Sequence, residues 1–107
     1  MVLRRMKYQL ILQWPASSVK DYDNMIEIEE VVIEGLGGIA KVDGHDAGSG
    51  EMNIFIFTDH PKLAFERVER VLGTKDFMPD LKAAYREVGR DEFTILHPPG
   101  LTYFAIA

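Results

Sequence analysis

Residues 54–57 of the chain read Ile-Phe-Ile-Phe, and they follow a polar segment, 43–51, that contains three glycines. A run this apolar belongs to a buried strand or to a buried piece of helix, and its β-branched and aromatic residues favour the strand. We therefore predict a central strand over 52–58. A short apolar run at 39–42 predicts a second strand, so that 43–51 becomes a nine-residue hairpin loop between the two.

The segment before this hairpin predicts a strand followed by a helix. Apolar and polar side chains alternate over 7–14, which predicts a strand with one buried face and one wet face. Ser18 and Asp21 have the spacing of a capping box, so we predict a helix over 18–36, ending where glycines accumulate. Its apolar half includes Ile33.

The segment after the central strand predicts a second helix and further strands. Pro61 suits the first turn of a helix over 61–72 that has a continuous apolar stripe. Residues 80–89 fit either a helix or the first arm of a hairpin. We favour the hairpin, because a strand over 92–97 follows at once. Residues 101–107 are apolar enough to add an edge strand or to dock on the domain.

The predicted elements follow the order β-α-β-β-α-β in a single α+β domain over residues 1–107. This order resembles the ferredoxin-like fold, which implies an antiparallel sheet with both helices on one face, here with an extra C-terminal strand or two. The segments Tyr8–Pro15 and Asp43–Asn53 also resemble small uncharacterised bacterial proteins. Neither resemblance implies an activity, because the ferredoxin-like fold supports enzymes, ligand sensors, RNA binders and interaction modules.

The composition excludes several functional classes. A formal net charge of −5 argues against a nucleic-acid binder, which needs a basic stripe to neutralise phosphates, and suits a basic protein partner. The chain has no cysteine, so disulfides, thiolate metal sites and a cysteine nucleophile are excluded. It also lacks a run of about 20 apolar residues, so we expect no membrane span. We expect a cytoplasmic protein.

Polar side chains that can bind a ligand concentrate in and beside the predicted loop, at His45, Asp46, Glu51 and Asn53. Carboxylates and an imidazole at this density can hold a divalent cation, although their spacing is not that of an EF-hand. Glu29 is the fifth candidate, because it falls inside the apolar half of the first helix. It is either a paired structural charge or a carboxylate held there for function. The alternative for the loop is a purely structural turn.

Three functional classes fit these patterns. The one we favour is a small acidic non-enzymatic interaction module, of an inhibitor or immunity type, whose acidic stripe blocks a basic partner; this stripe is Asp23, Glu27, Glu30 and Glu34. The second is a ligand- or metal-binding protein or a small enzyme that uses the segment 43–53. The third resembles the dimeric α+β barrel proteins and predicts a homodimer through the uncovered face of the sheet.

Overall fold

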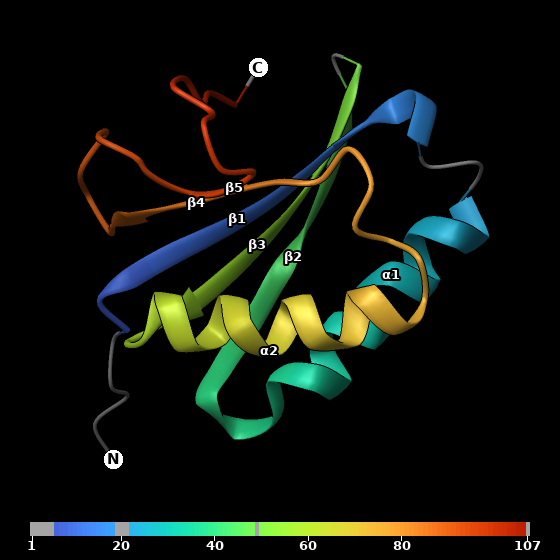
Figure 1. The fold of residues 1–107 in the computed structure, drawn as a ribbon. Helices are drawn as coiled ribbons and strands as arrows, with labels where there is room; N and C mark the ends of the chain where they lie inside the picture. Colours follow the sequence, from blue (N-terminus) through green and yellow to red (C-terminus); the bar gives the residue numbers. More distant parts are fainter. Residues whose placement is uncertain (1–5, 19–21, 49, 107) are drawn as a thin grey trace.

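The computed structural model describes residues 6–18, 22–48 and 50–106, which form an α+β fold with two helices and one five-stranded antiparallel sheet (Figure 1). The strands lie in the order β2-β3-β1-β4-β5, so β1 is central and β2 and β5 are the edges. Within the described ranges, neither helix has the length and apolar character needed to cross a membrane. The elements are β1 (Tyr8–Pro15), η1 (Ala16–Ser18), α1 (Tyr22–Leu36), η2 (Gly37–Ile39), β2 (Ala40–Gly48), β3 (Glu51–Thr58), α2 (Pro61–Thr74), β4 (Lys82–Glu87) and β5 (Thr94–His97).

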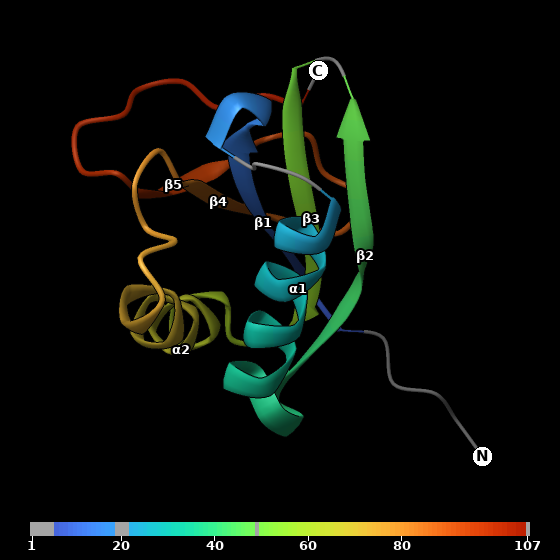
Figure 2. The same ribbon diagram turned by 90° about the vertical axis from the view of Figure 1, so that its right-hand side faces the viewer.

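Both helices pack on the face of the sheet that carries Leu10, Leu12 and Trp14 of β1 (Figures 1 and 2). The antiparallel register places Ile56 and Ile54 of β3 beside the first two of these residues. One core therefore joins both helices to the centre of the sheet, as the helical and strand periods of the sequence predict. The helices contribute Met25, Ile28, Val32 and Leu36 of α1 and Ala64, Phe65, Val68 and Leu72 of α2.

The C-terminal segment packs on the opposite face of the sheet. Ile11 and Ala84 are buried there together with Phe104, whose ring meets that of Phe93 edge-on at a centroid distance of 5.0 Å. Residues 101–106 thus dock on the domain and add no strand. They occupy part of the face through which the sequence predicts a homodimer, so less apolar surface remains there to drive that contact. The homodimer stays a prediction.

Two of the sequence predictions for single elements meet different outcomes. The hairpin predicted after residue 80 is confirmed, because β4 and β5 pair antiparallel, and the helix alternative is wrong. The capping box predicted from Ser18 and Asp21 falls partly outside the described residues, because Asp21 is not among them, and the described part of α1 runs from Tyr22. The hydroxyl of Ser18 donates a hydrogen bond of 2.7 Å to the carboxylate of Asp80.

Candidate functional site

Residues 43–48 belong to strand β2, so the nine-residue loop predicted from the sequence is wrong. β2 pairs with β3 as far as Gly48, with a bulge where the register shifts between Val42 and Gly44. Only residues 49 and 50 separate the two strands. A polar segment forms a strand here because β3 supplies hydrogen bonds along one side, while the edge position leaves the polar side chains in water.

Glu29 and His45, two of the predicted site residues, contact each other. His45 lies opposite Ile54 on the helix side of the sheet, and its Nδ1 is 2.8 Å from Oε2 of Glu29 on α1. Their side chains are 18% exposed for the glutamate and 29% exposed for the histidine. This geometry agrees with the structural interpretation of Glu29, in which a carboxylate at the margin of the core finds a polar partner.

The other three predicted residues lie on the far side of the same hairpin. Asp46 pairs with Asn53 across the strands, and Glu51 is two residues before Asn53 and shares its face. Asn53 is buried, and its Oδ1 accepts a hydrogen bond of 3.0 Å from Nε2 of Gln13. The same Nε2 donates to the backbone oxygen of Ala105 at 2.9 Å. Asn53 thus helps to hold the C-terminal segment, and the five predicted residues form no common cleft.

The five predicted residues therefore fall into two groups on opposite faces of the sheet. Within residues 6–18, 22–48 and 50–106, no three His, Cys, Asp or Glu side chains are grouped so that they can hold a metal ion. A cleft of about 460 Å³ elsewhere is lined mainly by prolines and apolar side chains, with Asp80, Lys82 and His97 as its ionisable residues. The carboxylate of Asp80 already accepts a hydrogen bond from the hydroxyl of Ser18. These groups do not make the nucleophile, base and oxyanion arrangement that acyl transfer requires.

We expect the contact between Glu29 and His45 to be weakly stabilising. Partly exposed ion pairs contribute about 0.2–1 kcal/mol, because solvent screens them and their side chains lose freedom. A double-mutant cycle of Glu29→Gln and His45→Ala, followed by urea unfolding, should therefore give a coupling of about 1 kcal/mol or less. A coupling near 3–5 kcal/mol, the range for breaking a buried pair, would contradict this description of the contact.

Negative charge is concentrated on α1 and β2. Residues 22–48 include seven acidic residues and one basic residue, a net charge of −6, so the rest of the chain carries +1. Among the described residues, no ion pair involves the exposed acidic members of this segment. α1 lies beside β2 (Figure 2), so these charges are carried by two neighbouring elements. We call them the acidic surface: Asp23, Glu27, Glu30 and Glu34 of α1 with Asp43 and Asp46 of β2.

Strand β2 also presents an open backbone edge. It is the outermost strand, and in the described part of the chain the backbone of residues 40–48 bonds to no segment except β3. Figure 2 shows its outer side clear of both helices. This edge was not expected from the sequence, because residues 43–51 have the composition of a loop. The Ser-Gly dipeptide at 49–50 is the signal that could have placed a tight turn there.

The chain was compared with protein-family models, with curated proteins and with solved structures, and none of them matches it.

Proposed function

We propose that this protein is a non-enzymatic interaction module that binds a basic protein partner through the acidic surface, in the manner of an inhibitor. The observation that carries this proposal is the charge distribution, because α1 and β2 hold a net charge of −6 in a chain whose total is −5. Exposed carboxylates without counter-ions add little to the stability of their own protein. They do accelerate association with a positively charged partner and help to select it.

We also propose that the domain is ferredoxin-like, with β5 and the C-terminal segment as additions. The strand order β2-β3-β1-β4 and the placement of both helices against one core support this description. The fold does not select the function, so the binding proposal rests on the surface alone. An experimental structure in which β1 does not lie between β3 and β4 would overturn the ferredoxin-like description.

A ligand-binding or enzymatic role for residues 43–53 has less support. Glu29 and His45 are on the helix side of the sheet, whereas Asp46 and Asn53 are on the other side. Asn53 is buried and bonded to Gln13, so its side chain is occupied by a structural contact.

Reversing two charges of the acidic surface should weaken the binding of a basic probe. Glu30→Lys with Glu34→Lys removes two attractions and adds two repulsions, each worth about 0.2–1 kcal/mol between exposed groups. The combined loss of about 1–4 kcal/mol corresponds to a rise in Kd of about fivefold or more. Fluorescence anisotropy with labelled hexalysine at low ionic strength measures this change.

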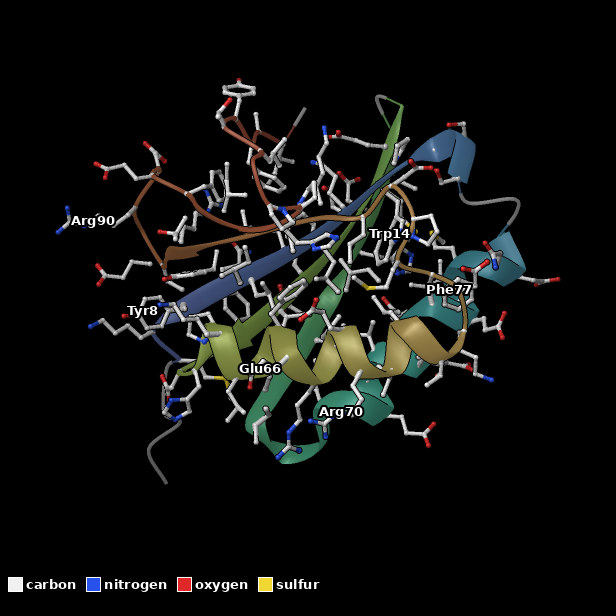
Figure 3. All side chains as sticks on the ribbon, in the orientation of Figure 1. Tyr8, Trp14, Glu66, Arg70, Phe77 and Arg90 are labelled. Atoms are coloured by element: carbon white, nitrogen blue, oxygen red, sulfur yellow. The ribbon has the colours of Figure 1, made fainter. Side chains whose placement is uncertain are left out.

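The matched control reverses the same number of charges on α2. Glu66→Lys with Glu69→Lys changes two exposed glutamates on that helix, where Glu66 is labelled in Figure 3. Arg67 and Arg70 already accompany them there, so this variant should raise the Kd for hexalysine much less. If both double variants weaken binding equally, the probe responds only to total charge, and the acidic surface is not the binding site.

A further inference from the structure

We propose that the basic partner binds by adding an extended segment to the free edge of β2, as a sixth strand of the sheet. This inference rests on the proposed function and specifies how the partner is recognised. The partner would present a basic strand, and main-chain hydrogen bonds would supplement the charge attraction, as in other cases of strand addition.

The backbone of β2 is a suitable template for such a strand. Outward N–H and C=O groups of an edge strand lack protein partners, and many proteins protect them with bulges, lysines or covering segments. β2 has nine residues and β5 has four, so β2 is the longer open edge. Lys41 and the bulge after Val42 protect its first part, whereas Gly44–Gly48 follows β3 in unbroken register. The five residues 44–48 therefore form the accessible template.

Apolar side chains of α1 flank this edge. Ile33 is 50% exposed, although the sequence pattern places it in the apolar half of the helix. It follows Glu29 by one helical turn, and Glu29 contacts His45 of β2, so Ile33 lies on the β2 side of α1. Ile26, nearly one turn before Glu29, is half-buried on the same side. A strand paired with β2 would cover these isoleucines with its own apolar side chains.

The negative charges near the β2 edge favour a basic strand as the added segment. A strand added to β2 would lie about 4.8 Å from it, which is less than the screening length of about 8 Å at physiological salt. Asp46 projects from the face of β2 opposite the helices, so basic side chains on that face of the added strand would lie within its field. Alternating apolar and basic residues would therefore satisfy both faces, with the apolar residues toward α1.

The same charges argue against a second copy of this chain at the β2 edge. Antiparallel pairing of two β2 strands would bring together two copies of residues 22–48, each with a net charge of −6. Like charges placed across an interface oppose association and exclude wrong partners. A basic segment from a different protein meets the opposite electrostatic condition, so it is the occupant that this edge favours.

An NMR titration with two designed peptides tests the proposal. The first peptide has eight residues in which lysine and valine alternate. The second has the same sequence with every backbone nitrogen methylated, so it keeps the charge and cannot donate main-chain hydrogen bonds. We expect the first peptide to shift the amide resonances of residues 40–48 and to slow their hydrogen exchange. The methylated peptide should bind at least tenfold more weakly.

The outcomes separate the mode of binding from the proposed function. If both peptides bind equally well and both lose affinity with the Glu30→Lys and Glu34→Lys variant, strand addition is wrong and charge recognition by the acidic surface stands. If the shifts fall on α2 or β5, strand addition at β2 is wrong. If neither peptide binds at millimolar concentration, both the strand addition and the proposed function are wrong.

Discussion

Replacing Trp14 with alanine should lower the free energy of unfolding by about 3–5 kcal/mol, the range for truncating a large buried aromatic residue. Trp14 is 2% exposed and belongs to the core between the sheet and the helices. Its Nε1 donates a hydrogen bond of 2.9 Å to the backbone oxygen of Phe77, and Figure 3 labels both residues. Alanine would therefore leave a cavity, and the partly buried backbone carbonyl of Phe77 would lose its hydrogen-bond donor.

Trp14 also ties the central strand to the connection between α2 and β4, which has no regular structure between residues 75 and 81. Trp14→Phe keeps most of the apolar volume but loses the donor to Phe77, so it should cost less, about 1–3 kcal/mol. Urea unfolding followed by circular dichroism measures both variants without relying on the fluorescence of the only tryptophan.

Tyr103→Ala is the matched control for this experiment, since Tyr103 is an aromatic residue that is 75% exposed. Its removal should change the unfolding free energy by no more than about 0.5 kcal/mol. If Trp14→Ala were as mild as Tyr103→Ala, the position of Trp14 in the core would be wrong.

Much of this fold could be predicted from the sequence, because most elements show a single clear period. The stripe of α2 and the alternation of β1 each identify the buried face correctly, as Val68 and Leu12 illustrate. Contacts between distant segments could not be predicted in this way. The hydroxyl of Ser18 bonds to Asp80, 62 residues away, and a local pattern cannot reveal such a partner.

The candidate site was harder to predict, because it depends on the register of β2. A polar segment with glycines has the composition of a loop, and only its pairing with β3 makes it an edge strand. That pairing then decides the faces, since adjacent residues of a strand point to opposite sides. His45 is thereby placed beside Glu29, while Asp46 is placed beside Asn53, and the five residues separate. The acidic residues of α1, by contrast, could be predicted as exposed from the helical period alone.

Replacing Gly35 with alanine should destabilise the protein by about 1–3 kcal/mol, although alanine usually stabilises a helix relative to glycine. Gly35 lies in α1 where this helix meets α2. A β-carbon at this position would be 2.7 Å and 2.8 Å from the two γ-carbons of Val71, and 3.3 Å from its β-carbon. Valine in a helix is largely confined to one rotamer, so Val71 cannot turn away. The two helices would have to move apart, which loosens the core between them.

Two further variants separate this clash from the general effect of glycine. Gly73→Ala lies in α2, where nothing is within 4 Å of the added carbon, so it should stabilise the protein by about 0.4–1 kcal/mol. The double variant Gly35→Ala with Val71→Ala removes both γ-carbons from the contact. It should be more stable than the sum of the two single changes implies, with a coupling of about 1 kcal/mol or more in urea unfolding. If the unfolding free energies of the two single variants simply add up in the double variant, α1 and α2 do not approach each other closely at Gly35. Only a direct contact between the two residues would let Val71→Ala relieve the clash caused by Gly35→Ala.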